Sequence, residues 1–129
     1  LGICLGMQLL FDESDEFGVH EGLHLIPGRV EAFPKDIDLL VPQMGWNQNV
    51  VNNEQSIFAD VLDGSYTYFV HSYYAKCDQQ YVVSYTNYGV KVPSCVEFKN
   101  VYGMQFHPEK SGEKGLEMLE RFIERVDER

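Results

Sequence analysis

The first eleven residues, LGICLGMQLLF, constrain the fold of this chain more than any other stretch. The apolar residues at the odd positions alternate as in a strand, and the apolar run that follows is typical of a short helix. At the junction, Gly2 and Gly6 flank Cys4 in the pattern G-x-C-x-G. This pattern is typical of a nucleophile elbow, a sharp turn that exposes a reactive side chain at the end of a strand.

The elbow pattern leads to three structural expectations. Side chains at Gly2 and Gly6 would collide across the turn, so we expect both glycines to be required by crowding. The sulfur of Cys4 should point toward the N-terminus of the next helix, where free N–H groups and the helix dipole favour a thiolate. The N–H of Leu5 would then be one donor to an oxyanion. The alternative is that Cys4 is simply a small buried hydrophobic residue.

The rest of the chain reads as strands followed by one long helix. Short strands are predicted in GLHLIPGRVEAF and LLVPQMGWNQNVV, and one or two helical turns in SIFADVL. Four β-rich runs follow: SYTYFVHSYYAKC, QYVVSYTNYG, PSCVEF and VYGMQFH. We therefore predict an α/β fold in one domain over residues 1–129, with a mixed central sheet flanked by helices and a smaller antiparallel sheet near residues 25–50.

The closing segment SGEKGLEMLERFIERVDER has the spacing of an amphipathic helix. Ser111 is suited to cap its start, and Glu113 favours the positive end of the helix dipole. The predicted apolar face consists of Leu116, Leu119, Phe122, Ile123 and Val126.

The charge and the cysteines narrow the function classes. Twenty acidic against ten basic residues give a net charge of −10, which disfavours binding to nucleic acid. No apolar run is long enough for a membrane helix, and no secretory signal pattern opens the sequence. Three cysteines, an odd number, indicate reduced thiols and a cytoplasmic protein. Cys77 and Cys95 lie in apolar contexts and are interpreted as small buried residues.

A cysteine nucleophile needs a base, and His107 is the histidine best placed to be one. It ends the strand run VYGMQF, and Pro108 then turns the chain away from regular pairing. Glu109 follows two residues later and can orient the imidazole through its other nitrogen. The alternative for His107 is an ordinary polar residue at the end of a strand.

A second histidine pattern, His20-Glu21-Gly22-Leu23-His24, fits the zinc-binding motif H-E-x-x-H. That motif requires a helix, because only there do its two histidines face the same way. Gly22 within the motif and the strand-like flank disfavour a helix, and no third ligand is evident. We expect no metal here, but two solvent-facing histidines near a turn.

GICLGMQ followed by a distant FHPE resembles the class I, or triad, glutamine amidotransferases. The additional segments LIPG, PQMGWN and YFVHSYYA, together with FHPEKSG, are similar to one family of that class, the glutaminase subunits of imidazole glycerol phosphate synthase. The resemblance covers essentially the whole chain. It implies a flavodoxin-like fold, a cytoplasmic enzyme that hydrolyses glutamine, no cofactor, and a heterodimer with a (β/α)₈ cyclase subunit that receives the ammonia for histidine biosynthesis.

The resemblance also implies roles for single residues. Cys4, His107 and Glu109 correspond to the catalytic triad, and Leu5 to the oxyanion donor. The substrate glutamine would be bound by Gln8, by Glu16 at its α-amino group, and by the backbone of Ser72 and Tyr73 at its α-carboxylate. The residues that would face the cyclase are Trp46, Asn47, Tyr68 and Lys110. His20 and His24 depart from the family pattern, in which small or apolar residues are usual.

The family domain has a further N-terminal portion ahead of the elbow, which supplies strands of the central sheet and a second oxyanion donor. We therefore expect this chain to be the C-terminal portion of such a domain and a weak catalyst by itself, since a missing oxyanion donor costs about two to three orders of magnitude in rate. Two alternatives stay open. One is the glutaminase of another class I amidotransferase such as GMP synthetase, and the other is an impaired relative that acts only as a binding subunit.

Overall fold

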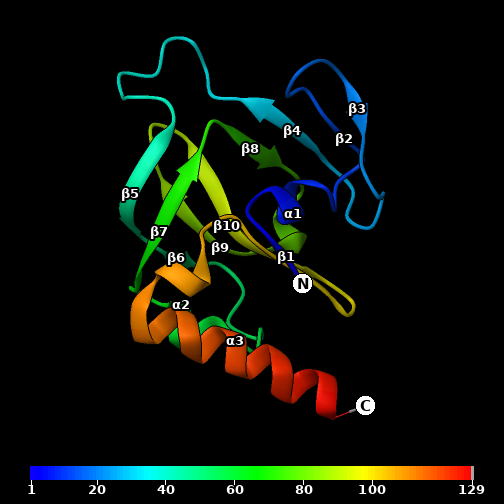
Figure 1. The fold of residues 1–129 in the computed structure, drawn as a ribbon, viewed down its shortest axis with the longest axis vertical. Coiled ribbons are helices and arrows are strands. Elements are labelled where there is room, and N and C mark those ends of the chain that lie inside the picture. The colour runs from blue at the N-terminus through cyan, green and yellow to red at the C-terminus, as the bar shows by residue number, and fades with distance from the viewer. Residues whose placement is uncertain (129) are drawn as a thin grey trace.

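The structure is a computed structural model in which residues 1–128 are described. Its largest sheet has five strands in the order β1 (Gly2–Ile3), β11 (Val101–Met104), β10 (Lys91–Phe98), β9 (Val82–Asn87) and β6 (Val50–Val51). Only β1 and β11 run parallel; the other neighbours are antiparallel. The prediction of a mixed sheet is confirmed, and Figure 1 shows β1 near the N-terminus.

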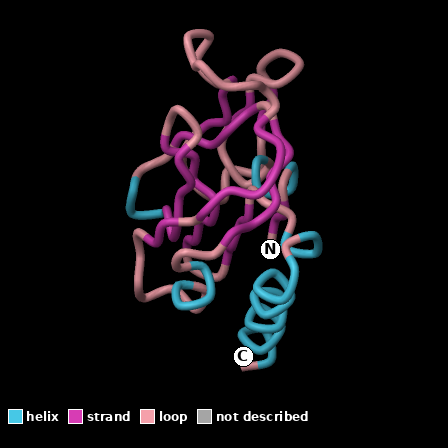
Figure 2. The backbone as a smooth tube through the Cα atoms, turned by 90° about the vertical axis from the view of Figure 1, so that its left-hand side faces the viewer, coloured by secondary structure: helices cyan, strands magenta, loops and turns pink. Residues whose placement is uncertain are grey.

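Both faces of this sheet are covered, as predicted for a sheet flanked by helices. Successive residues of a strand point to opposite faces. Cys95 accordingly packs in a cluster with α2 (Ala59–Leu62) and α3 (Gly112–Asp127), whereas Val96 packs with residues that follow β1 and with the second sheet. Helices α2 and α3 lie together at one end of the molecule in Figures 1 and 2.

The strands of residues 25–50 do not form a sheet of their own, which corrects the prediction. Strand β4 (Arg29–Ala32) pairs with β8 (Tyr73–Lys76) in a four-stranded sheet whose other members are β2 (Glu13–Ser14) and β3 (His20–Glu21). Strand β5 (Gln43–Gln48) instead pairs with β7 (Tyr66–His71). The partners come from the later tyrosine-rich run, because Ser72 divides that run into two strands that enter different sheets.

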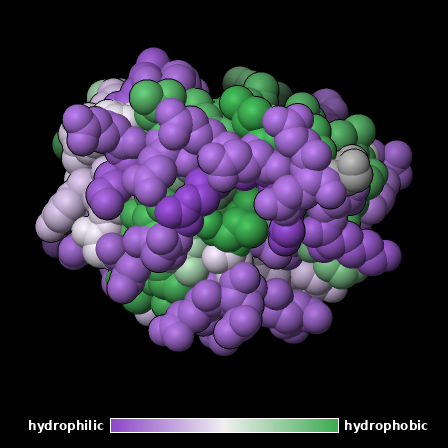
Figure 3. All heavy atoms as spheres, turned by 90° about the horizontal axis from the view of Figure 1, so that it is seen from below, coloured by the Kyte–Doolittle hydropathy of each residue, from purple (hydrophilic) through white to green (hydrophobic). Residues whose placement is uncertain are grey.

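Helix α3 forms as predicted, but it is rotated relative to the predicted apolar face. Gly115 lies against Pro108, and Met118 and Phe122, on the same side, pack into the core. Leu116 and Ile123 remain 57% and 58% exposed. Figure 3 views the molecule from this end and shows hydrophobic residues exposed between hydrophilic ones. The close approach at Gly115 thus sets the orientation of the helix, which its hydrophobic periodicity alone does not define.

The start of α3 is also held differently from the prediction. Ser111 does not cap the helix with its side chain. Its hydroxyl donates to the carbonyl oxygen of His107 at 2.6 Å and accepts the N–H of Tyr68 at 3.0 Å. Ser111 therefore joins α3 to β7 and to the short 3₁₀ helix η2 (Pro108–Lys110).

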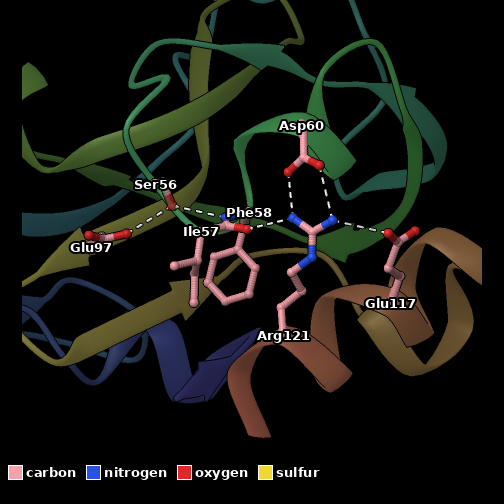
Figure 4. A network of polar contacts seen from close by, with 7 residues as sticks. All are labelled: Ser56, Ile57, Phe58, Asp60, Glu97, Glu117 and Arg121. Atoms are coloured by element: carbon pink, nitrogen blue, oxygen red, sulfur yellow. Dashed lines mark hydrogen bonds and ion pairs between the residues drawn. The ribbon is translucent and has the colours of Figure 1, made fainter. Parts of the chain in front are cut away.

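Arg121 of α3 forms polar contacts with α2 and with the residue Ile57 just before it. Arg121 donates to the carbonyl oxygen of Ile57 at 2.8 Å, pairs with Asp60, and contacts Glu117 at 3.1 Å (Figure 4). The pairing with Arg121 lowers the pKa of Asp60.

A second 3₁₀ turn, η1 (Gln79–Tyr81), precedes β9. Within residues 1–128, no helix has the length and apolar character needed to cross a membrane.

Candidate active site

The predicted elbow is present and strained. Cys4 follows β1 with φ 55° and ψ −108°, a positive φ that non-glycine residues rarely adopt. Its N–H donates to the carbonyl oxygen of Met104 at 2.7 Å. The next residues form α1 (Leu5–Gln8), which is shorter than the apolar run suggested. Such strain is typical of functional positions, where the surrounding structure enforces it.

The two glycines of the motif are required for different reasons. A Cβ at Gly2 would lie 2.8 Å from the Met7 nitrogen and closer still to the Gly6 carbonyl oxygen, so crowding demands glycine there. A Cβ at Gly6 would meet no atom within 4 Å. The prediction of crowding is therefore confirmed for Gly2 and wrong for Gly6, because Gly6 faces away from the turn.

The thiol of Cys4 is held in its protonated form. Burial raises its pKa, and the negative charges of Glu109 and Glu16 raise it further. The backbone N–H of Leu5 and the side-chain amide of Gln105 act in the opposite direction. The donors expected from the helix N-terminus are present, but burial outweighs them, so the net direction is opposite to the one we predicted from the helix N-terminus. A thiol in this state depends on a nearby base for activation.

His107 and Glu109 lie at the end of the neighbouring strand. His107 follows β11 and its Nδ1 atom lies 2.9 Å from Oε2 of Glu109. Its backbone N–H donates to the carbonyl oxygen of Tyr68 at 2.9 Å, which ties the turn to β7. The His107 side chain is 21% exposed and that of Glu109 50% exposed. Nδ1 of His107 thus contacts the Glu109 carboxylate, and Nε2 is the ring nitrogen that can exchange a proton with a nucleophile or substrate.

The parallel pairing of β1 with β11 brings these two sequence motifs together. Ile3 lies opposite Met104, so Cys4 and the segment after Met104 both follow the C-terminal ends of these two parallel strands. Gln105, the first residue of that segment, places its Nε2 atom 3.7 Å from Sγ of Cys4. Glu109, whose charge raises the pKa of Cys4, and His107, which contacts Glu109, follow Gln105 in the same segment.

A pocket of about 250 Å³ opens beside the elbow. Gln8 and Glu16 both line it, together with Leu5, Ser14, Phe17 and His20. Gln8 is 6% exposed, and its Nε2 atom donates to the carbonyl oxygen of Tyr73 at 3.0 Å and to Oε1 of Gln105 at 3.1 Å. The amide protons of Gln8 are therefore used within the protein, and its Oε1 atom is the one suited to a ligand.

Ser72 and Tyr73 lie at the junction between β7 and β8. They line a different cavity, of about 440 Å³, next to the loop of residues 33–41. The carbonyl oxygen of Tyr73 is already an acceptor for Gln8 and, at 2.8 Å, for Nδ1 of the buried His71. Burial lowers the pKa of His71 to about 4, so its ring is neutral at physiological pH.

The residues expected to face a partner gather on β5, β7 and η2. Trp46 is 54% exposed and its ring packs edge-on to Tyr68, its register partner, with centroids 6.1 Å apart. Asn47 is half-buried and accepts from Gln43 at 3.1 Å. Lys110 is exposed in η2, directly after the His107–Glu109 pair. Trp46 is therefore not a core aromatic.

The H-E-x-x-H pattern is not on a helix. His20 and Glu21 form strand β3, and His24 has a positive φ of 55°. The ring of His20 contacts the carbonyl oxygen of Phe17 at 2.8 Å, and that of His24 contacts Asp12 at 3.0 Å. No group of metal-ligating side chains is found among residues 1–128.

The other two cysteines differ from Cys4 in their surroundings. Cys95 is completely buried in the core, and burial raises the pKa of its thiol. Cys77 is partly buried, which raises its pKa to about 11.

Three buried polar residues to which the sequence assigned no role are Gln105, His71 and Gln43. Their signal was a polar side chain within an otherwise apolar strand run.

A known protein family matches this chain over nearly its whole length. The family model "Glutamine amidotransferase class-I" matches residues 1–126. The chain is 58% identical over 126 residues to the imidazole glycerol phosphate synthase subunit HisH of Lactiplantibacillus plantarum, covering 98% of this chain and 60% of that protein. It is 53% identical to the HisH subunit of Archaeoglobus fulgidus, covering 95% of this chain and 62% of that protein. The chain thus spans about 60% of the length of these curated relatives.

One solved structure has a similar fold. It is described as Trypanosoma brucei CTPS, glutaminase domain with bound acivicin, and it matches with a TM-score of 0.55 at 18% identity. The match covers 95% of this chain and 59% of that one. At this identity the likeness supports the fold alone, a mixed α/β arrangement.

Proposed function

Because the chain belongs to the class-I glutamine amidotransferase family, we propose that it carries the glutaminase site of an imidazole glycerol phosphate synthase in histidine biosynthesis. The protein would hydrolyse glutamine to glutamate and ammonia in the cytoplasm, with residues 1–129 as part of its glutaminase domain. The observation that carries this proposal is the hydrogen bond from Cys4 N–H to the Met104 carbonyl, which aligns the ends of β1 and β11. Identities of 58% and 53% to HisH subunits support the choice of synthase.

In the proposed reaction Cys4 attacks the side-chain amide carbon of glutamine. His107 takes the thiol proton, and the N–H of Leu5 stabilises the developing oxyanion. The tetrahedral intermediate collapses as His107 returns the proton to the leaving nitrogen, which releases ammonia and leaves a γ-glutamyl thioester. Water, deprotonated by His107, then attacks the thioester; the C–S bond breaks to release glutamate, and the Cys4 thiolate takes the proton back from His107. Glu109, 2.9 Å from Nδ1, holds the ring and stabilises its protonated form.

The pocket beside the elbow is the proposed binding site for glutamine. Its volume of about 250 Å³ suits a small amino acid. The carboxylate of Glu16 would bind the α-amino group of the substrate, and Oε1 of Gln8 would accept a hydrogen bond from it. The substrate would extend from this pocket past Gln8, whose amide contacts the Tyr73 carbonyl oxygen at 3.0 Å, so that the backbone N–H groups of Ser72 and Tyr73, in the other cavity, bind its α-carboxylate.

The proposed partner is a (β/α)₈ cyclase subunit that consumes the ammonia. At neutral pH free ammonia is mostly protonated and loses its nucleophilicity, so direct transfer between subunits has a chemical advantage. The proposed contact surface is formed by Trp46, Asn47, Tyr68 and Lys110. It lies beside the active site, because Tyr68 accepts a hydrogen bond from His107 and Lys110 follows Glu109. An exposed aromatic pair is typical of an interface anchor.

Covalent labelling tests the glutaminase proposal. A glutamine analogue with an electrophilic side chain should modify Cys4, and should leave Cys77 and Cys95 unmodified because burial raises the pKa of both thiols. An excess of glutamine should protect Cys4. Equal labelling of the three cysteines, or no protection, would contradict a glutamine site. Binding to the cyclase without any labelling of Cys4 would favour the alternative of a binding subunit.

Activity with the partner distinguishes the two candidate synthases. Glutamine-dependent synthesis of imidazole glycerol phosphate should appear when the protein is combined with its cyclase subunit. Glutaminase activity that is stimulated instead by a GMP synthetase domain would favour the second class I candidate.

A further inference from the structure

We propose that Gln105 is a positioning residue for Cys4, and that two buried amides, Gln8 and Gln105, form a relay which fixes an N–H donor on the Cys4 sulfur. The relay begins at the carbonyl oxygen of Tyr73, passes through Gln8 and Gln105, and ends at Sγ. Gln105 is completely buried and Gln8 is 6% exposed. This inference deepens the proposed function, since it describes how the proposed nucleophile is held.

The direction of the relay follows from its fixed end. A backbone carbonyl oxygen can only accept, so the Gln8 side chain must turn its NH₂ group toward Tyr73, 3.0 Å away. The same NH₂ group then faces Gln105 at 3.1 Å, where only the carbonyl oxygen of the Gln105 amide makes a hydrogen bond. The NH₂ group of Gln105 is left pointing at Cys4 Sγ, 3.7 Å away. A flipped Gln105 would leave two donors facing each other inside the protein.

The amide of Gln105 favours the thiolate form of Cys4, whereas most of the surroundings of Cys4 favour the thiol. In the thiol form, the S–H of Cys4 donates to the carbonyl oxygen of Val70 at 3.8 Å. Burial, together with the negative charges of Glu109 and Glu16, disfavours a thiolate, whereas the N–H groups of Leu5 and Gln105 support it. When His107 removes the proton, the Val70 contact loses its donor, but the Gln105 contact becomes a stronger, charge-assisted bond.

The substitution Gln105→Met tests the relay, because methionine is similar in size and has no N–H donor. We would measure the rate of Cys4 alkylation by iodoacetamide as a function of pH in the full chain, without glutamine. A hydrogen bond to a charged group is worth about tenfold or more in an equilibrium. At pH 7 the variant should therefore react about tenfold more slowly, and its profile should shift toward higher pH.

Two controls separate positioning from general destabilisation. Asn49→Leu removes another buried amide, which bonds Ser65 and Thr67 and not Gln8, Gln105 or Cys4, and it should leave the profile of Cys4 unchanged. Cys95, which is completely buried, reports unfolding in every variant by becoming alkylated. If Gln105→Met exposes Cys95, the variant Gln8→Met is used instead. Without Gln8, the Gln105 side chain is free to rotate away from the sulfur. The rate of Cys4 alkylation should then fall, but by less than the roughly tenfold expected when the Gln105 amide is removed.

The outcomes distinguish this inference from the proposed function. An unchanged profile in folded Gln105→Met, or in folded Gln8→Met where the first variant unfolds, would overturn the relay. An equal shift in Asn49→Leu would also overturn it. A wild-type protein that shows no glutaminase activity even with the cyclase subunit present, but whose Cys4 profile still responds to Gln105→Met, would contradict the proposed function and leave the relay standing.

Discussion

His107 Nδ1 lies 2.9 Å from Glu109 Oε2, although Pro108 separates the two residues in the chain. The proline begins η2, whose tight turn folds the glutamate back onto the imidazole. The backbone N–H of His107 is meanwhile bonded to Tyr68 on β7, so the pair is anchored to the sheet. This contact needs only three consecutive residues, and it fixes which ring nitrogen of His107 is available.

Glu109→Gln should reduce glutaminase activity by about 100-fold, because an amide cannot stabilise the protonated imidazole. The loss should be smaller than the ~10⁴-fold found for buried acids of catalytic triads, since the Glu109 side chain is half exposed. The measurement is kcat for glutamine hydrolysis with the synthase partner present. Glu113→Gln, at the start of α3, is the matched control and should retain full activity. Equal activities in both variants would remove Glu109 from the mechanism.

Gly2→Ala and Gly6→Ala should have opposite effects on stability. The Cβ at position 2 would collide with the backbone of Gly6 and Met7, so the free energy of unfolding should fall by at least about 2 kcal/mol. The Cβ at position 6 meets open space within a helix, and it should change stability by less than about 1 kcal/mol, in the stabilising direction. Urea unfolding of both variants checks this. Similar losses would show that the elbow is not crowded as described.

Acidification should destabilise the fold through His71. The folded-state pKa of about 4 lies below the usual 6.5, so the unfolded chain binds a proton more readily. The free energy of unfolding is therefore unaffected by His71 above pH 6.5 and falls as the pH drops from 6.5 toward 4, by up to about 3 kcal/mol. Urea unfolding at several pH values measures this. His71→Gln should flatten the dependence in that window; an equally steep dependence would assign it to other groups.

Trp46→Ala should weaken binding to the proposed cyclase subunit by at least about tenfold, because it removes the exposed aromatic residue that we propose as an anchor. Trp46 is 54% exposed, so the thermal midpoint of the isolated protein should change little. Ile123→Ala is the control, since Ile123 is 58% exposed on α3 and is not part of the proposed surface. Titration of the cyclase by calorimetry gives the affinities. Equal affinity of the Trp46 variant and the wild type would remove Trp46 from the proposed interface.

The local chemistry of the site could be predicted from the sequence because it depends on neighbours in the chain. Cys4 between glycines specifies a strained turn, and His107-Pro108-Glu109 specifies a histidine with an adjacent acid. The strands of the tyrosine-rich half were likewise predicted from local composition. Each of these features involves a few consecutive residues, so the sequence pattern contains all the necessary information.

The tertiary structure decided whatever depends on residues far apart in the chain. Strands β4 and β5 pair with β8 and β7 rather than with each other, and the orientation of α3 is set where Gly115 meets Pro108. The state of the Cys4 thiol also depends on the fold, because burial and the amide of Gln105 act on it only after β1 and β11 have paired. Pairing, burial and charge proximity are sums over contacts that form only on folding. The sequence by itself therefore determined which groups are present, and the fold decided how each is protonated and held.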